Sequence, residues 1–196
     1  MAAVDKSLYE KFIIESVNRA KSADISAGVV GFSYFEDVFS PMITARVVVA
    51  NTGNAIEGED GKIQSLYNGF PLRGGERMQI KIAGNSQDND GLEFNDFYVG
   101  SITDVMIDSG RELFTLNLIS REAITNETIR VGKKFPSSQK ISDSVGDICK
   151  NYLSSDKLYD VDETQNPYGF YGNMRKPFTV LTMLASKSVP GNVSGK

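Results

Sequence analysis

The side chains that could carry out catalysis are few in this 196-residue chain, and their spacing matches no common catalytic site. The absence of histidine excludes the Ser-His-Asp and Cys-His mechanisms. The single cysteine, Cys149, stands among regularly spaced apolar residues, which indicates a packing role in a core. Ser137 and Lys140 have a Ser-x-x-Lys spacing, but no partner motif follows them, and the start of a helix explains the pair better.

Carboxylates gather in two polar stretches that contain glycine. Glu57, Glu59 and Asp60 could form an acid–base pair, but a solvated loop gives no reason for the shifted pKa values that such a pair needs. Residues 86–91 superficially resemble a calcium loop, yet the first position lacks an acid and the twelfth is Phe97, where a bidentate Glu is required. A single thiol also excludes a thiolate zinc cluster. We therefore expect no enzymatic activity, no catalytic residues, no metal and no cofactor.

The charge is divided unevenly along the chain. Residues 1–110 carry 9 Lys and Arg against 16 Asp and Glu, whereas residues 111–196 carry 12 against 9. An acidic first half argues against nucleic-acid recognition, which depends on clustered basic side chains. The exception is a basic cluster that we interpret as a solvated face, formed by Arg130, Lys133, Lys134 and Lys140. No apolar run approaches the roughly 20 residues of a membrane span, so we expect no membrane insertion.

Most elements of the first 120 residues have the pattern of β-strands. Residues 43–49 and 77–82 alternate between apolar and polar side chains, as strands with one buried face do. Further strands are expected over residues 9–18, 29–36, 93–107 and 112–120, with a possible bulge at Gly100. Residues 63–70 (IQSLYNGF) have the pattern of a short helix. The spacing predicts a small antiparallel β-barrel or sandwich with one short inserted helix.

The pattern changes after Ser120. Apolar residues recur at helical spacing over residues 141–152 and again over 178–185, with an aromatic loop over residues 166–172 between them. We therefore predict a mainly β chain with α+β character. A β-barrel domain would span residues 1–135, and the incomplete start of an α+β domain would span residues 136–196.

Several segments, taken in their order, resemble a known family. They are FSYFEDVFSP (32–41), ITARVVVANTGN (43–54), PLRGGERMQIKI (71–82), FTLNLISREAITNE (114–127), RVGKKF (130–135) and KISDSVGDIC (140–149). Together they resemble the N-terminal part of the baseplate hub proteins of contractile-tailed, T-even-like bacteriophages. The resemblance covers residues 29 to about 186, and its most specific pieces are PLRGGE and the run over residues 112–153.

The resemblance implies a structural role. Such hub proteins form a trimer at the centre of the baseplate, below the tail tube and above the puncturing spike. Each family chain has two similar β-barrels, so three chains present six barrels in a ring. The ring thereby connects the threefold symmetry of the spike to the pseudo-sixfold symmetry of the tail tube. The implied partners are further copies of the chain, the spike protein, the tail tube protein and other baseplate proteins. The implied location is the tail of the virion, after assembly in the cytoplasm of the host bacterium.

The resemblance also implies a second barrel, for which these 196 residues have no counterpart. Either the sequence is a fragment, or another chain supplies the missing barrel. Apolar residues in loops are the candidates for assembly contacts: Phe39, Met42, Phe70, Leu72 and Tyr168. A place in the core of the barrel itself is the alternative for each of them.

Two other functions are compatible with the sequence. A carbohydrate-binding or carbohydrate-active β domain would use Glu57, Glu59 or Asp60 near the aromatic residues 168–171. A retaining glycosidase would need two carboxyl groups about 5–5.5 Å apart across a cleft, and an inverting glycosidase would need a larger separation. The second alternative is the hub of a related contractile injection or secretion device, which would have the same mechanical role but would not belong to a phage.

Overall fold

The computed structural model describes residues 8–51, 56–57, 63–70, 72–84, 91–108, 111–155 and 161–191, with the backbone alone at residues 56, 57, 63, 64 and 68. The chain divides into two compact units. The first comprises Met1–Asp37 and Met42–Arg121, and the second comprises Val38–Pro41 and Glu122–Lys196. The domain boundary expected between residues 135 and 136 stays a prediction, because compactness alone does not show which segment folds independently.

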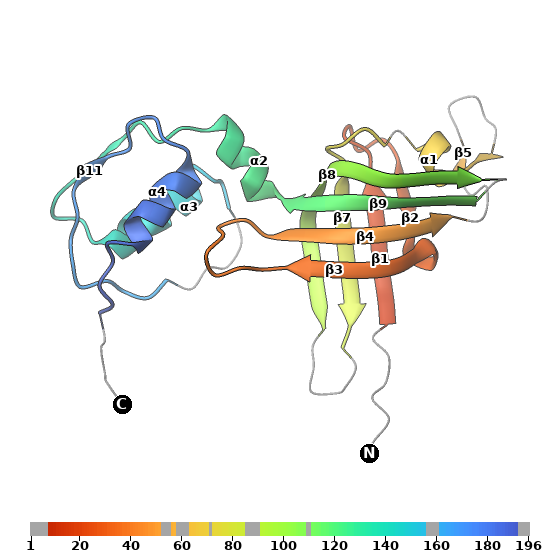
Figure 1. The fold of residues 1–196 in the computed structure, drawn as a ribbon. Coiled ribbons are helices and arrows are strands. Elements are labelled where there is room, and N and C mark those ends of the chain that lie inside the picture. The colour runs from red at the N-terminus through yellow and green to blue at the C-terminus, as the bar shows by residue number, and fades with distance from the viewer. Residues whose placement is uncertain are drawn as a thin grey trace, which may run out of the picture. The chain divides into compact units, whose positions relative to one another are not determined.

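Seven strands of the first unit form one curled antiparallel sheet in the order β2-β1-β7-β8-β9-β4-β3 (Figure 1). Their bounds are β1 (Leu8–Glu15), β2 (Ser22–Asp24), β3 (Val29–Phe35), β4 (Thr44–Asn51), β7 (Arg77–Ala83), β8 (Leu92–Asp108) and β9 (Arg111–Ser120). The two short strands β5 (Ile56–Glu57) and β6 (Ile63–Gln64) pair with each other. The predicted mainly β architecture, with an antiparallel barrel-like sheet, is confirmed.

Alternating side chains along the central strands form the core of the first unit. Val47 of β4 lies opposite Leu116 of β9, and Ala45 lies opposite Leu118, so the buried faces of the two strands match in register. The alternation expected over residues 43–49 and 77–82 is confirmed by the buried residues Ala45, Val47, Val49, Met78, Ile80 and Ile82. In β9, Phe114, Leu116 and Leu118 are buried as well. A one-residue slip in any of these strands would move its apolar face to solvent, which fixes the register.

Aromatic side chains fill the space inside the curled sheet where β1 and β3 approach each other. The ring of Phe12 in β1 lies 5.8 Å from that of Phe32 in β3, and the ring of Tyr34 stacks at 5.0 Å on that of Phe94 in β8. A 3-10 turn, η1 (Ser26–Gly28), adds polar contacts to β1. The N–H of Phe12 donates to Ser26 Oγ at 2.8 Å, and the N–H of Ile25 donates to the Phe12 carbonyl at 2.8 Å.

The long strand β8 is irregular at two places. Its pairing with β9 shifts register between Val99 and Ser101, which confirms the bulge expected at Gly100. A second shift lies between Thr103 and Met106, where Asp104 has a φ of 54°. The left-handed backbone is strained for most residues but tolerated by Asp. Its carboxylate accepts a hydrogen bond from Arg46 Nη2 at 2.8 Å, which ties the bulge to β4.

The short helix α1 (Leu66–Gly69) lies within the segment predicted to be helical, residues 63–70. The helix begins only after Ser65, because residues 63–64 are taken by β6. Leu66 and Phe70, four positions apart, share the face that enters the core of the first unit. The inserted helix is therefore present, although it is a single turn.

The second unit has a small core of its own between two helices and a short two-stranded sheet. Its elements are α2 (Arg121–Thr128, of which Arg121 belongs to the first unit), β10 (Lys134–Phe135), α3 (Ile141–Asn151), β11 (Phe170–Tyr171) and α4 (Pro177–Ala185). The buried residues are Val131, Phe135, Ile141, Ile148, Val180 and Leu184. The predicted helices over residues 141–152 and 178–185 correspond to α3 and α4, whereas α2 was not expected.

Candidate assembly surfaces

The five predicted contact residues occupy different environments. Phe39 is 92% exposed and Met42 is 39% exposed, whereas Phe70 is buried at 2%. Leu72 packs half-buried against the core of the first unit, and Tyr168 packs in the same way against that of the second. Their part in assembly stays a prediction. The burial of Phe70 shows, however, that this side chain is needed by the fold of its own unit.

The most exposed apolar residues described are two neighbours between β3 and β4. Val38 is 94% exposed and stands directly before Phe39. Two acidic residues, Glu36 and Asp37, precede them. The carboxylate of Glu36 accepts a hydrogen bond from the Tyr34 hydroxyl at 3.0 Å. We call residues Val38 and Phe39 the apolar tip.

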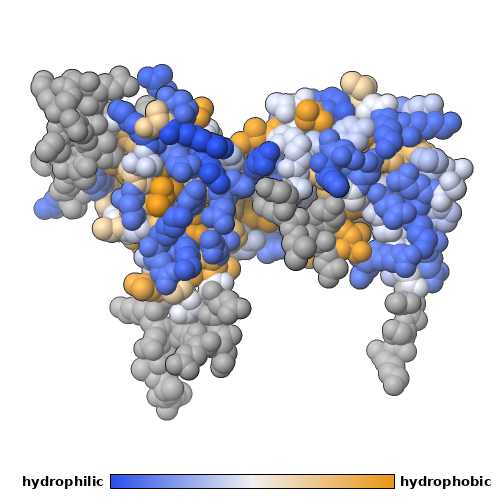
Figure 2. Space-filling view, turned by 180° about the vertical axis from the view of Figure 1, so that it is seen from behind, coloured by the Kyte–Doolittle hydropathy of each residue, from blue (hydrophilic) through white to orange (hydrophobic). Residues whose placement is uncertain are grey.

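Further exposed apolar residues are distributed over both units. On the face seen in Figure 2, orange apolar patches alternate with hydrophilic surface. Val105, Met106 and Ile107 are exposed in succession on β8, beyond the last residue that pairs with β7. In the second unit, Tyr171 of β11 and Met174, three residues later, are exposed. Successive exposed apolar residues on one strand are typical of surfaces that other proteins cover.

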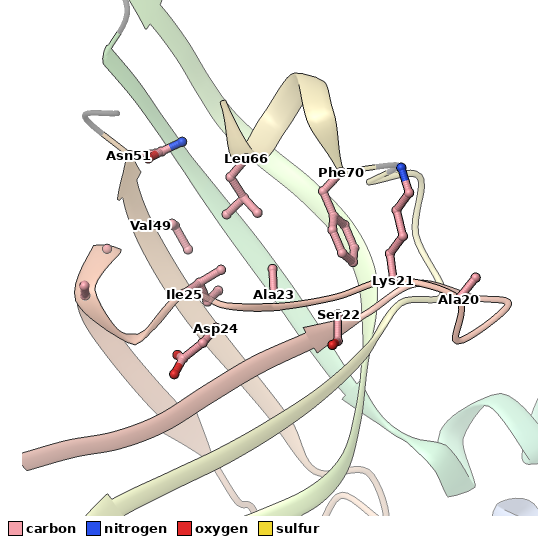
Figure 3. A pocket seen from close by; sticks show the side chains of 12 residues that line it. Ala20, Lys21, Ser22, Ala23, Asp24, Ile25, Val49, Asn51, Leu66 and Phe70 are labelled. Carbon is pink, nitrogen blue, oxygen red and sulfur yellow. The ribbon is translucent and has the colours of Figure 1, made fainter. Parts of the chain in front are cut away.

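A pocket of about 560 Å³ opens in the first unit between the β2–η1 segment, the end of β4 and α1 (Figure 3). Leu66 and Phe70 enter it from α1 and face the side of Ile25 and Ala23. Lys21 lines the pocket as well, so an apolar interior meets a cation. We call this cavity the barrel pocket.

The acidic residue of the barrel pocket, Asp24, is held by its neighbours. Its carboxylate accepts a hydrogen bond from the N–H of Ser26 at 2.9 Å and another from the hydroxyl of Ser26. In Figure 3 this carboxylate points away from the apolar side chains. Because the Asp24 carboxylate is held by Ser26, it does not neutralise the positive charge of Lys21 at the pocket.

Two buried carboxylates, which sequence reasoning did not single out, act as structural anchors. Glu76 is fully buried and accepts hydrogen bonds from the N–H of Arg73 at 2.6 Å and from the N–H of Gly74 at 3.0 Å. It thereby closes the turn of the PLRGGE motif, in which Gly74 and Gly75 have φ values of 95° and 90°. The sequence signal was the acid directly after two glycines, since a left-handed turn exposes N–H groups that a carboxylate can bind.

Glu112 performs a similar task at the start of β9. It is buried and accepts hydrogen bonds from the Ser65 hydroxyl and from the N–H of Tyr67, the latter at 3.2 Å. Both donors lie at the beginning of α1, where helix N–H groups lack partners within the helix. The carboxylate therefore fixes α1, and with it one wall of the barrel pocket. Both buried acids are occupied by these contacts, which gives them a structural role.

The basic cluster of the second unit is largely engaged within the chain. Arg130 Nη1 donates to the carbonyls of Glu127 and Ile129 at 3.0 and 2.7 Å, which caps the end of α2. Lys133 pairs with Asp147 at 3.0 Å, and Lys140 pairs with Glu163. These contacts agree with the interpretation as a solvated face.

Tyr168 belongs to a stack of three aromatic rings in the second unit. Its ring lies 5.9 Å from that of Phe170, which in turn stacks on Phe135 at 4.4 Å with 7° between the planes. The ammonium groups of Lys187 and Lys133 lie 5.2 Å from the ring centres of Tyr168 and Phe135, respectively. The stack joins β10 and β11 to the loop before β11, so its first role is to stabilise the unit.

The carboxylates considered for acid–base chemistry cannot be placed: the side chain of Glu57, and Glu59 and Asp60, lie outside the described residues, as do residues 86–90 of the calcium-like loop. Within the described ranges, no group of three or more Cys, Asp or Glu side chains is arranged to hold a metal ion. None of the helices in those ranges is long and apolar enough to cross a membrane. The carbohydrate hypothesis stays a prediction.

Comparison with known proteins identifies the fold through structure alone. No protein-family model matches the chain, and no curated protein sequence matches it significantly. The 43 kDa tail protein of prophage MuSo2 from Shewanella oneidensis matches with a TM-score of 0.57 and 11% identity, over 93% of this chain and 48% of that protein. A tail protein from Neisseria meningitidis MC58 matches with a TM-score of 0.52 and 11% identity, over 90% and 44%. The chain thus has the fold of these tail proteins and spans about half of their length.

Proposed function

We propose that the chain is a structural component of a phage tail baseplate hub, which oligomerises and connects the tail tube to the puncturing spike. The observation that carries the proposal is the shared fold with two tail proteins over nine tenths of the chain. The order of sequence segments over residues 29–186 supports it independently, because it points to hub proteins of contractile tails.

The side chains of the described residues fit a role in assembly. The two buried carboxylates, Glu76 and Glu112, bind backbone and hydroxyl donors and hold turns in place. Exposed apolar residues, in contrast, occur on the apolar tip, on β8 and at or just after β11. Rigid barrels with apolar outer patches suit permanent interfaces, which typically bury about 2,000 Å² or more.

The proposed assembly is a trimer in the tail of the virion, put together in the host cytoplasm. Its partners would be the spike protein, the tail tube protein and other baseplate proteins. A ring with pseudo-sixfold symmetry requires six similar barrels. Three copies of the barrel described above account for half of such a ring.

Mass measurement in solution by light scattering tests the proposal. The chain is measured alone and together with the spike protein encoded beside it, at several concentrations. We expect the mass of a trimer and, with the spike, a larger complex of fixed stoichiometry. A chain that stays monomeric at all concentrations and does not bind the spike protein would contradict the proposed hub function.

A further inference from the structure

We propose that the barrel pocket receives the C-terminal end of an extended partner chain. The partner would add as a strand to the outer edge of β2, place apolar side chains in the pocket and bring its carboxylate next to Lys21. All residues of this site belong to the first unit. The inference goes beyond the hub proposal, because such a site would serve a monomer as well as an oligomer.

The first observation is an open strand edge beside the pocket. β2 stands at one end of the strand order, and β1 is the only described strand that pairs with it. The N–H of Ile25 donates to the carbonyl of Phe12 at 2.8 Å, so the backbone of Ile25 bonds toward β1. Because these directions alternate along an antiparallel strand, the N–H and C=O groups of Ser22 and Asp24 face the opposite edge. An extended chain can bind such groups as an additional strand.

The second observation is that the inner face of this edge belongs to the pocket. In Figure 3, Lys21 and Ala23 point to the side of α1, whereas Ser22 and Asp24 point away from it. The pocket volume of about 560 Å³ lies within the range of roughly 300–1,000 Å³ that is usual for ligand sites. A side chain that points inward from an added strand would therefore enter the pocket.

The third observation is a cation at the pocket that pairs with no described carboxylate. Asp24 is held by Ser26, and none of the ion pairs of the described residues includes Lys21. The backbone of Lys21 is fixed, because its N–H donates to the hydroxyl of Ser16 at 3.0 Å and its carbonyl accepts from the N–H of Ser16 at 2.9 Å. An ammonium group beside an apolar lining favours an occupant that joins an anion to apolar side chains.

Strand direction explains why this anion would be a C-terminus. An added antiparallel strand runs against β2, so its C-terminal end lies beside the N-terminal end of β2, next to Lys21. With its last residue opposite Lys21, its third-from-last residue lies opposite Ala23. Opposite residues place their side chains on the same face, so both of these side chains would point toward the pocket. The expected partner therefore ends in the pattern apolar-x-apolar with a free carboxyl group.

Amide hydrogen exchange of the chain without a partner tests the open edge. The N–H groups of Ser22 and Asp24 should exchange at least tenfold faster than that of Ala23, which lies opposite Ile14 and bonds toward β1. Equal protection of the three amides would mean that the edge is already covered, by the chain itself or by a second copy, and would overturn the inference.

Fluorescence anisotropy with synthetic peptides tests the site itself. Dye-labelled hexapeptides with Val, Leu, Ile or Phe at the last and third-from-last positions are compared with the same peptides as C-terminal amides. We expect the free acids to bind the full chain at least tenfold more tightly than the amides. Lys21→Gln should remove this difference, whereas Lys11→Gln, on the outer face of β1, is the matched control and should keep it. If no peptide binds, or if acids and amides bind the wild type equally, the inference is wrong.

Methylation of the peptide backbone distinguishes strand addition from binding by the carboxylate alone. The N–H of the next-to-last residue would face Ser22, and that of the third-from-last residue would face away from β2. A methyl group on the first nitrogen should weaken binding at least tenfold, and one on the second is the matched control. If both methylated peptides bind equally and decanoate binds as tightly as the best peptide, the occupant is a small amphiphile and strand addition is refuted. None of these measurements depends on trimer formation, which tests the hub proposal separately.

Discussion

At the scale of single residues, burial separates two groups among the predicted contact positions. Phe39 and Phe70 are both aromatic residues next to turns, and we expected the same assembly role for both from their sequence context. Phe70, however, lies one helical turn after Leu66, so both side chains share the buried face of α1. The four-residue spacing from Leu66 was therefore the sequence signal for the burial of Phe70. The exposure of Phe39 depends on the loop between β3 and β4 and had no local signature.

The buried position of Phe70 predicts a loss of stability rather than of assembly. Phe70→Ala should lower the free energy of unfolding by about 3–5 kcal/mol, because it removes a ring from a packed core. Phe39→Ala, the matched control at an exposed site, should change it by less than about 0.5 kcal/mol. Urea denaturation monitored by circular dichroism measures both. Equal stabilities of the two variants would mean that Phe70 is not a core residue.

The buried carboxylate of Glu76 gives a second prediction. Glu76→Ala leaves the N–H groups of Arg73 and Gly74 without their acceptor and should cost about 1–3 kcal/mol. Glu93→Ala, at an exposed position on β8, is the control and should be nearly neutral. Thermal unfolding of both variants provides the comparison. If both variants melt like the wild type, the turn does not depend on this carboxylate.

The thiol of Cys149 should be unreactive at neutral pH. Burial in α3, together with the nearby negative charge of Glu122, raises its pKa above the ordinary value. Because only the thiolate attacks, alkylation by iodoacetamide should be slow and should rise at higher pH than for an unfolded reference. Mass spectrometry measures the rate of this alkylation between pH 7 and 10. Equal rates in the native and the urea-unfolded chain would refute the assignment.

At the scale of elements, the strands were predictable where one face is buried and the other is exposed to solvent. The alternation in β4, β7 and β9 carried enough information to assign both strand and inward face. α2 was missed because the sequence REAITNET buries only Ala123 and Asn126 and has no apolar stripe. Its end is fixed by Arg130, and its position by a contact with α4, which are tertiary effects. The two carboxylate anchors were missed for the same reason.

The contact between α2 and α4 predicts a specific role for Asn126. Its Oδ1 accepts a hydrogen bond at 2.8 Å from the N–H of Phe178, in the first turn of α4, where helix N–H groups lack internal partners. Asn126→Ala should lower the stability of the second unit by about 1–2 kcal/mol. Asn126→Asp keeps an acceptor oxygen and should lose less. Hydrogen exchange of the amides at the start of α4 distinguishes the two variants; identical protection would exclude the cap.

At the scale of the whole molecule, each hydrophobic core lies within one unit. The core of the first includes Phe12, Phe70 and Phe114, and that of the second includes Phe135 and Ile148. We therefore expect two transitions in calorimetry, one lowered by Phe70→Ala and the other by Asn126→Ala. A single transition that both variants lower equally would show that the units unfold together.

Strand β9 has a consequence for how a mechanical load would pass through the first unit. It pairs with β8 along one edge and with β4 along the other, so it lies inside the sheet and is held on both sides. α2 begins at Arg121, directly after β9 ends at Ser120. A pull on the chain beyond β9 would therefore have to shear two ladders of backbone hydrogen bonds at once, which makes this strand a strong attachment point for the segment that follows it.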